Sequence, residues 1–310
     1  MRIQMHMHDR RIRFLYEAWR NGSMRAAADV LNVAPSSVSR QIAQLEEETG
    51  TDLIEHGRRE IRLTDAGHAV LDYYRSQQAS LEFLEGQLLD ITSARAGHVE
   101  FAIGEGFLGQ ALYDTLDSFM KDYPRITLNV SVTDTTQMMR MILDDEVHFG
   151  VGFHPISHPQ ILSRYRATVP LMAIMHVGHP LAQRQSLSMA ELCAEALALM
   201  GPTFRIRQMI DEAATNNGLM VAPIVTSNSI GLLSRMAIER RAMTVLPAFS
   251  VAAELARGEL TAVSVDAPQL QSVYVHLLAR RNRRFPPHLD ALSDHIRKRL
   301  LPSTLSSPRE

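Results

Sequence analysis

The chain has 310 residues, of which 45% are hydrophobic and 21% charged, and this length allows two or three domains with separate cores. The formal net charge of −2 argues against a strongly basic nucleic-acid-binding domain, and the sequence shows neither an apolar stretch of membrane-spanning length nor a signal-peptide core. Cys193 is the single cysteine, which excludes an intramolecular disulfide and fits a reducing cytoplasmic setting.

Residues 11–20 carry apolar side chains at helical spacing and are followed by Asn21-Gly22. The pattern predicts a supporting helix that packs behind the next two.

Residues 24–49 predict two helices joined by a tight turn. Ser23 is suited to cap the first helix, whose apolar face is formed by Ala26, Ala27, Val30 and Leu31. Asn32 and Val33 form the turn, and Pro35 fits the first turn of the second helix. On that helix one stripe is expected to be buried, and it consists of Val38, Ile42 and Leu45.

The remaining faces of the second helix carry small hydroxyls and an arginine near its start. Such a helix suits the DNA major groove, where its N-terminal end reaches base edges and phosphates. We predict DNA contacts from Arg25, Pro35, Ser36, Ser37, Ser39, Arg40 and Gln44. Taken alone, the stretch is equally consistent with a helical hairpin whose polar face is solvated.

The order and register of these residues closely resemble the helix-turn-helix region of LysR-type transcriptional regulators. The matching residues are 23–28, Leu31, 35–42, 45–46, Gly50, Leu53, Arg58 and 63–67. The length and later layout also match, so the resemblance covers nearly the whole chain. It implies a winged helix-turn-helix, a dimerising linker helix and a two-lobed α/β effector domain of the periplasmic-binding-protein type. It also implies double-stranded DNA and a small-molecule effector as partners, and a tetramer made of two dimers; no cofactor is expected.

Residues 51–63 alternate in an extended pattern around a His56-Gly57 turn, which predicts the hairpin of a wing. In the family, a wing arginine commonly stands where this chain has His56. We therefore assign the wing's phosphate contacts to Arg58 and Arg59 and place the DNA-binding domain at residues 1–63. Eight arginines are available to gather on one face of this domain, and they are Arg10, Arg11, Arg13, Arg25, Arg40, Arg58, Arg59 and Arg62.

Residues 64–95 predict a long linker helix that Thr64 caps and that reaches about Ser93. Its apolar residues are spaced three and four apart, as in a coiled coil, and they are Val70, Tyr74, Leu81, Leu84, Leu88 and Ile91. The alternative is a helix packed on its own domain. We favour pairing with a second copy, which predicts a two-fold symmetric DNA site.

Residues 96–301 alternate strands and helices, which predicts an α/β domain with a parallel sheet. The segment 96–98 is expected to break the linker helix. The first lobe takes in about residues 96–166 and 266–301, with strands at 99–103, 126–132 and 148–153, a helix capped by residues 133–136, and a return strand at 273–279. The second lobe spans about 167–265, with strands at 171–177, 196–200, 223–226 and 243–246. Residues 302–310 are expected to form a flexible tail.

In open α/β sheets ligands bind beyond the carboxyl ends of strands, against helix N-termini. This rule selects Glu105, Gly106, Phe107, Thr133, Thr135, Thr136, Pro202, Thr203, Phe204, Arg205, Ser227, Asn228 and Ser229. Backbone N–H groups and hydroxyls there suit an anionic group, with Arg205 adding an ion pair. If Glu105 faces the cleft, it accepts from an amine or hydroxyl, which indicates an amino-acid-like ligand. For each hydroxyl alone, a helix cap is the simpler role.

The sequence thus predicts a cytoplasmic, ligand-responsive DNA-binding regulator and not an enzyme. One alternative is a metal-responsive regulator that uses the scattered His154, His158, His176 and His179, although each of these fits a surface or capping role. The other is an α/β enzyme with a helical oligomerisation domain. No Ser-His-Asp order or paired carboxylates support it.

Overall fold

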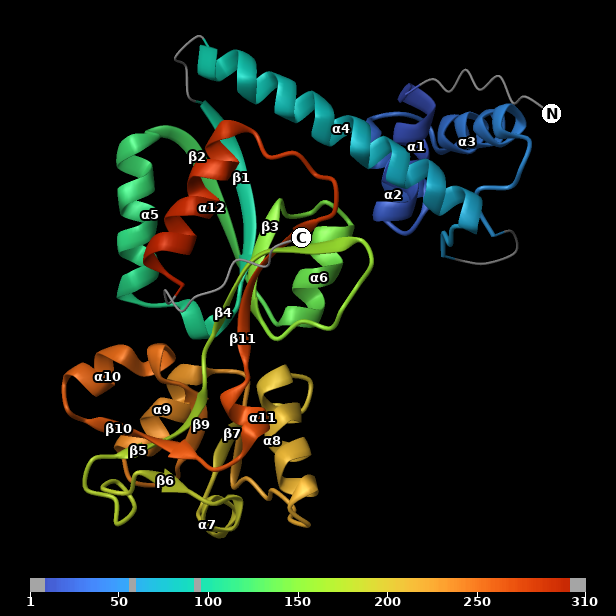
Figure 1. Ribbon diagram of the computed structural model, residues 1–310. Coiled ribbons are helices and arrows are strands. Elements are labelled where there is room, and N and C mark those ends of the chain that lie inside the picture. The colour runs from blue at the N-terminus through green and yellow to red at the C-terminus, as the bar shows by residue number, and fades with distance from the viewer. Residues whose placement is uncertain (1–8, 56–59, 92–95, 302–310) are drawn as a thin grey trace. The chain divides into compact units, whose positions relative to one another are not determined.

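The computed structural model describes residues 9–55, 60–91 and 96–301 (Figure 1). The chain divides into two compact units, Met1–Glu85 and Gly86–Glu310. The division falls within α4 (Asp65–Ile91), the helix predicted to be the linker. Within the described ranges, no helix has both the length and the apolar character needed to cross a bilayer.

The first unit is built from α1 (Asp9–Arg20), α2 (Met24–Leu31), α3 (Pro35–Thr49) and the first part of α4. Each of the first three helices packs on the other two, around a core to which α4 also contributes. The helix-turn-helix predicted from the sequence is confirmed. Its buried stripe is also confirmed, because Val38, Ile42 and Leu45 are each at most 2% exposed.

Local sequence determines where these helices begin and end. The Ser23 hydroxyl accepts a hydrogen bond from the Ala26 N–H at 3.1 Å and so caps α2. Asn32 ends α2 in the left-handed conformation (φ 53°), which asparagine tolerates well. The predicted apolar face of α2 is partly wrong: Val30 is 57% exposed, and Ala28 is buried beside Ala27 instead.

The segment after α3 is held to that helix by one carboxylate. Glu46 Oε1 accepts from the N–H groups of Leu53 at 2.8 Å and Ile54 at 3.2 Å. Ile54 then bridges to Leu63 in antiparallel fashion, as expected at the base of a hairpin. His56, Arg58 and Arg59, the predicted wing residues, lie outside the described residues, as does the predicted tail at 302–310.

The predicted coiled-coil seam of α4 divides into two parts. Val70 and Tyr74 are buried in the core of the first unit, so this part of the helix packs on its own domain. Leu81 and Leu84 are each 50% exposed. Thr64 caps the helix as predicted, accepting from the Gly67 N–H at 3.1 Å.

The second unit begins with lobe I, a five-stranded sheet in the order β2-β1-β3-β11-β4. Its strands are β1 (Ala96–Ile103), β2 (Arg125–Val132), β3 (Phe149–Phe153), β4 (Ile161–Thr168) and β11 (Tyr274–Arg280). β1 is parallel to β2 and β3, whereas β11 is antiparallel to both its neighbours, so the predicted parallel sheet is a mixed one. Residues 96–98, expected to break the linker helix, belong to β1.

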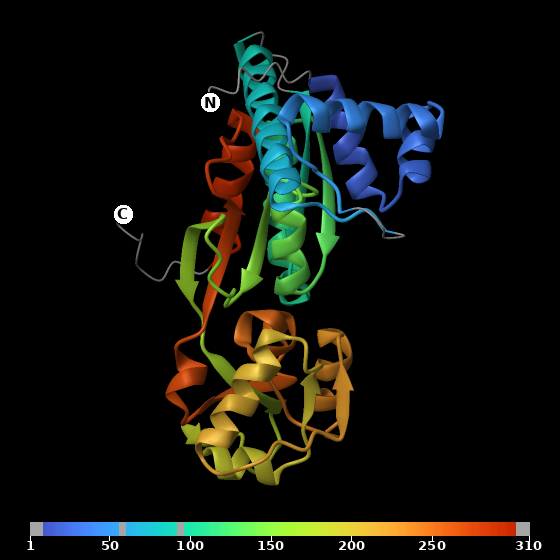
Figure 2. The same cartoon turned by 90° about the vertical axis from the view of Figure 1, so that its right-hand side faces the viewer.

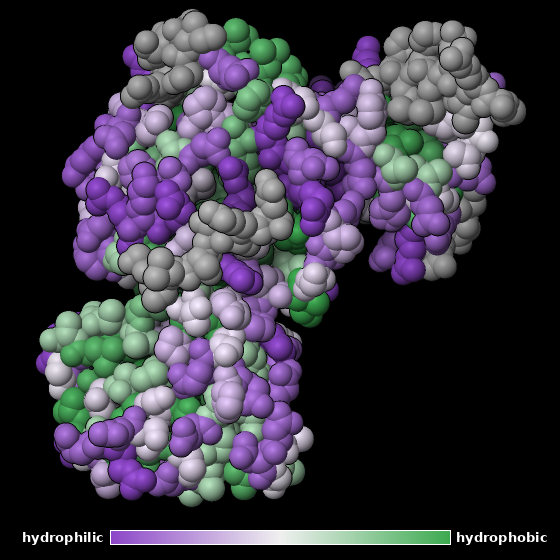
Figure 3. Space-filling view, in the orientation of Figure 1, coloured by the Kyte–Doolittle hydropathy of each residue, from purple (hydrophilic) through white to green (hydrophobic). Residues whose placement is uncertain are grey.

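Helices cover both faces of this sheet. The helices α5 (Gln110–Asp122) and α12 (Pro287–Arg299) lie on one face, and α6 (Thr135–Leu143) lies on the other (Figure 1). Hydrophilic side chains predominate over α5 and α12 on the face seen in Figure 3. Gly150 of β3 is needed for α6 to approach, because a Cβ there would lie 2.5 Å from the Met138 side chain.

Lobe II holds a four-stranded sheet, β6-β10-β5-β9, and the parallel pair β7-β8. The strands are β5 (Leu171–His176), β6 (Ser186–Leu187), β7 (Ala198–Met200), β8 (Val225–Ser227), β9 (Thr244–Pro247) and β10 (Leu260–Val265). The helices are α7 (Met189–Ala194), α8 (Arg205–Asn216), α9 (Ile230–Ile238), α10 (Ala252–Ala256) and α11 (Pro268–Gln271). Two 3₁₀ turns complete the unit: η1 (Glu105–Phe107) in lobe I and η2 (Ala248–Val251) in lobe II.

The chain passes between the lobes twice, after β4 and before β11. The two connecting segments run side by side (Figure 2), and the Val169 N–H donates to the Val273 carbonyl at 2.8 Å. β4 was not predicted from the sequence, and with β11 it forms the part of lobe I from which lobe II extends.

Candidate functional site

The DNA-contact residues predicted in the first unit lie on the outer surface of α2 and α3. Arg25, Pro35, Ser36, Ser39 and Arg40 are exposed, and Ser37 and Gln44 are partly exposed. The helical period that buries Val38, Ile42 and Leu45 leaves these side chains outside the core.

The first turn of α3 has no side-chain cap. Its N-cap residue is Ala34, which offers no hydrogen-bonding side chain, so the first-turn N–H groups lack a side-chain acceptor there. Such an end attracts anions such as phosphate. At the other end of the helix, Glu48 forms an ion pair with Arg11. The predicted arginine cluster therefore contains one member whose charge is already paired.

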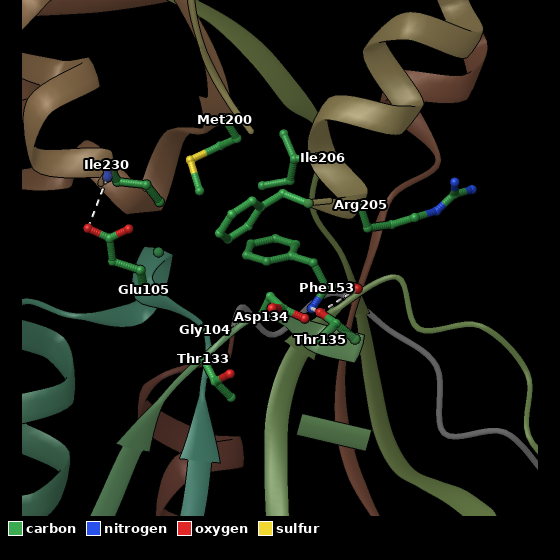
Figure 4. A pocket seen from close by; sticks show the side chains of 12 residues that line it. Gly104, Glu105, Thr133, Asp134, Thr135, Phe153, Met200, Arg205, Ile206 and Ile230 are labelled. Atoms are coloured by element: carbon green, nitrogen blue, oxygen red, sulfur yellow. Dashed lines mark hydrogen bonds between the residues drawn. The ribbon is translucent and has the colours of Figure 1, made fainter. Parts of the chain in front are cut away.

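A pocket lies in the second unit, at the carboxyl ends of β1, β2, β3 and β7 (Figure 4). It contains about 420 Å³ of empty space, part of it open to solvent. Its lining residues are Gly104, Glu105, Gly106, Thr133, Asp134, Thr135, Phe153, Met200, Phe204, Arg205, Ile206 and Ile230. An adjoining, more open cavity of about 910 Å³ shares Glu105, Thr133, Asp134 and Phe204 with it, and adds Leu108, Val132, Asn228 and Ser229.

The strand-end rule selected most of the loops but not all of the residues. Of the predicted effector contacts, Glu105, Gly106, Thr133, Thr135, Phe204, Arg205, Asn228 and Ser229 line the two cavities. Phe107, Thr136, Pro202, Thr203 and Ser227 belong to neither lining among the described residues. The apolar walls were missed, namely Phe153, Met200, Ile206 and Ile230. Phe153 and Met200 are the last residues of β3 and β7, so the strand-end rule could have selected them.

Hydroxyls at the pocket are largely occupied by the backbone. Thr135 Oγ1 donates to the Phe153 carbonyl at 3.1 Å and accepts from the Phe153 N–H at 3.2 Å. The cap of α6 is Asp134, within the predicted capping segment 133–136, and its side chain accepts from the Gln137 N–H at 2.9 Å. The Ser227 hydroxyl accepts from the Ser229 N–H at 3.0 Å. The hydroxyls of Thr135 and Ser227 thus bond to the backbone of the protein, although neither residue is a helix cap.

Glu105 joins the two lobes across the pocket. Its Oε1 accepts a hydrogen bond from the Ile230 N–H at 2.9 Å, at the first turn of α9 (Figure 4). Its Oε2 is buried and has no hydrogen-bond partner within the described part of the chain. Glu105 belongs to the lining of both cavities, which is the condition under which the sequence indicated a ligand with an amine or hydroxyl group.

Arg205 does not extend into the pocket. Its guanidinium points away from Glu105 (Figure 4) and pairs with Glu212 at 2.8 Å, about two turns along α8. The expected ion pair between Arg205 and an anionic ligand would have to compete with Glu212.

A group of stacked aromatic rings also connects the lobes. Phe107 of η1 lies 5.2 Å from Phe153 and 5.0 Å from Phe249 of η2, measured between ring centroids. Phe107 is buried here, which is why it does not line the pocket. With the Glu105–Ile230 hydrogen bond, the rings hold η1 against lobe II.

Two histidines lie near the segments that connect the lobes. Burial, reinforced by repulsion from His154 and Arg166, lowers the pKa of His276 to about 4. Burial and then the charge of Arg205 also lower the pKa of His154. His276 Nδ1 is hydrogen-bonded to the Ser163 hydroxyl at 2.8 Å. The His276 imidazole is therefore neutral at neutral pH. No group of three or more His, Cys, Asp or Glu suited to hold a metal occurs among the described residues.

Comparison with known proteins identifies both parts of the chain. Residues 10–68 match the family model "Bacterial regulatory helix-turn-helix protein, lysR family", and residues 92–301 match "LysR substrate binding domain". The transcriptional activator CmpR of Synechocystis sp. is 27% identical over 81% of this chain and 83% of its own length.

Solved structures share the fold. A full-length OxyR variant from Pseudomonas aeruginosa superposes with a TM-score of 0.70 at 19% identity, covering 97% of this chain and 99% of that one. Full-length CbnR, solved with its target DNA, gives 0.55 at 20% identity over 94% and 99% of the two chains. The curated relatives are transcriptional regulators and not enzymes. The helix-turn-helix followed by a two-lobed α/β domain, together with these matches, places the chain in the LysR family of DNA-binding transcriptional regulators.

Proposed function

We propose that the protein binds a two-fold symmetric DNA operator as a homodimer, with α3 in the major groove, and that a small molecule in the pocket alters this binding. The observation that carries the proposal is the surface of α3. Ser36, Ser39 and Arg40 are exposed beside a helix N-terminus that no side chain caps. An arginine so placed suits guanine or a phosphate, and the hydroxyls and N–H groups suit phosphates.

Dimerisation through α4 rests on its exposed leucines. Leu81 and Leu84 lie one turn apart and are each half-exposed, and Tyr73 adds a third large apolar side chain that is 44% exposed. A second copy of the helix would cover this face. Two linked α3 helices would then bind an inverted repeat more tightly than one helix binds a half-site. A tetramer of two such dimers extends the same proposal.

The regulatory step follows from the position of the pocket between two lobes. A ligand that contacts both η1 and the first turns of α8 and α9 binds one arrangement of the lobes better than others. It therefore shifts the population of the protein toward that arrangement. The proposed result is a change in how subunits pack, and hence in the spacing of the α3 helices on DNA.

The test is operator binding by the full chain, measured by fluorescence anisotropy on DNA from the protein's own promoter region. Arg40→Ala is expected to weaken binding by about tenfold to a hundredfold, because one good base or phosphate contact contributes about 1–3 kcal/mol. Arg235→Ala, an exposed arginine on α9 of lobe II, is the charge-matched control. If Arg40→Ala binds the operator as tightly as the wild type does, α3 is not the helix that binds DNA.

A further inference from the structure

The carboxylate of Glu105 occupies the end of α9 that an anionic ligand would need. The Ile230 N–H donates to Glu105 Oε1 at 2.9 Å, and the Ser229 hydroxyl accepts from the Leu232 N–H at 3.4 Å. Two donors of the first turn of α9 are thus already bound by the protein. A carboxylate ligand arriving there would also meet the charge of Glu105.

The second oxygen of Glu105 remains an unused acceptor. Oε2 is buried and has no hydrogen-bond partner among the described residues. Figure 4 shows this oxygen on the side of Glu105 that faces Met200 and Phe153, toward the inside of the pocket. A buried, unpaired carboxylate oxygen is costly, so a ligand that donates a hydrogen bond to it gains binding energy.

The charges of the lining favour a cation. Glu105 and Asp134 are the acidic residues of the pocket, and Arg205 is its basic residue. The Arg205 guanidinium is paired with Glu212 and points away from Glu105, so it does not counter the negative charge beside Glu105. The walls beside Glu105 are apolar, formed by Phe153, Met200, Phe204, Ile206 and Ile230.

We propose that the pocket takes an amine: a small molecule whose ammonium group donates to Glu105 Oε2 and whose apolar body packs between Phe153, Met200 and Phe204. The proposal rests on the proposed function, because it names the chemical class of the effector. The sequence alone allowed an anionic ligand group at the helix N-termini and an amine on Glu105. The proposal keeps the amine and excludes an anionic group at the start of α9.

The experiment measures thermal shift and titration calorimetry of the full chain with matched probes. Each triple shares one apolar body and differs in its polar group: 2-phenylethylamine, 2-phenylethanol and phenylacetate, then 3-methylbutylamine, 3-methylbutanol and 3-methylbutanoate. We expect an amine to bind at least tenfold more tightly than its carboxylate partner. In Glu105→Gln, which keeps an acceptor for the Ile230 N–H, amine affinity should fall by about tenfold to a hundredfold, as for loss of a charged hydrogen bond.

Asp117→Asn, an exposed carboxylate on α5 that pairs with Lys121, is the matched control and should leave amine affinity unchanged. The comparison of amine and carboxylate binding uses the wild-type protein alone, so it tests the proposal even if Glu105→Gln does not fold. The proposal is overturned if no amine binds, if carboxylates bind more tightly, or if Glu105→Gln binds amines as well as the wild type does. Operator binding is measured separately. A carboxylate that binds and changes the affinity for DNA would overturn the proposal of an amine effector, while the proposal that the protein is a ligand-responsive regulator would stand.

Discussion

The proposed DNA-binding surface of α3 and the pocket of the second unit are built in different ways. On α3, one helix determines the exposure of every candidate contact, because the same period that buries Val38, Ile42 and Leu45 turns Ser39 and Arg40 outward. The pocket instead draws on segments between residues 104 and 230, and many of its polar groups already bond to the protein. A surface on one helix can be identified from spacing alone, whereas a site between loops also depends on which groups remain available.

The largest effect expected is on the core beneath α3. Leu45→Ala should destabilise the first unit by about 2–5 kcal/mol, because Leu45 is fully buried and truncation leaves a cavity. Operator binding should be lost, while ligand binding by the second unit persists. Calorimetric unfolding and anisotropy check both statements. Val30→Ala, at an exposed position of α2, is the control and should cost about 0.5 kcal/mol or less.

Loss of ligand binding in Leu45→Ala would show that the two regions are not stabilised by separate cores.

The second prediction concerns His276, whose pKa of about 4 lies below the value of about 6.5 expected in the unfolded chain. Between these values the unfolded chain binds a proton that the folded protein does not. Stability is therefore complete above pH 6.5 and falls as the pH is lowered toward 4. The loss between pH 7 and pH 5 should be roughly 2 kcal/mol, and His276→Gln should lack it.

Urea unfolding at the two pH values measures this difference. His68→Gln, at an exposed position of the first unit, is the matched control variant. An equal pH dependence in wild type and His276→Gln would assign the acid sensitivity elsewhere.

The third prediction separates two threonines of the pocket. Thr135→Val should destabilise the protein by about 1–2 kcal/mol, since both hydrogen bonds between its hydroxyl and the Phe153 backbone are lost. Thr133→Val, on the same wall, should change stability by about 0.5 kcal/mol or less and act on ligand affinity instead. Chemical denaturation and calorimetry distinguish these outcomes. Similar destabilisation by both variants would mean that Thr133, too, serves the fold.

The smallest effect expected is that of Arg205→Ala. Its ion pair with Glu212 lies partly exposed on α8, so its removal should cost about 1 kcal/mol or less. Amine affinity should change by less than about threefold, because the guanidinium points away from Glu105. Glu212→Ala is the matched variant. A carboxylate probe that binds only when Arg205 is present would show that the arginine can turn inward.

Much of the architecture could be predicted from the sequence, because it depends on local signals. Ser23, Asn32 and Pro35 delimit the helices of the DNA-binding unit, and the positions of the parallel strands of lobe I follow from apolar runs between helices. β4 was missed because its segment, with Arg164 and Arg166 between partly buried residues, is an edge strand with few apolar side chains. The antiparallel β11 was predicted as a strand, but its direction depends on a return from lobe II that no local pattern encodes.

The candidate site could be predicted only in part, for a related reason. The strand-end rule located Glu105, Thr133 and Phe204, whose loops follow buried strands. The rule does not predict the hydrogen bond between Thr135 and Phe153 or the ion pair between Arg205 and Glu212, because these contacts depend on how the chain packs. Phe107 shows the same limit: its ring is covered by Phe249, which lies far along the chain.

The paired connections between the lobes have a consequence for protein design. Because the Val169 N–H reaches the Val273 carbonyl, the chain leaves lobe I and re-enters it at neighbouring points. Lobe II is thus an insertion within lobe I, and a short splice from Thr168 to Tyr274 would excise it. Such a miniature would keep η1 and the Thr133 loop while discarding α8 and α9, which would convert half of the binding site into an open surface for grafting another module.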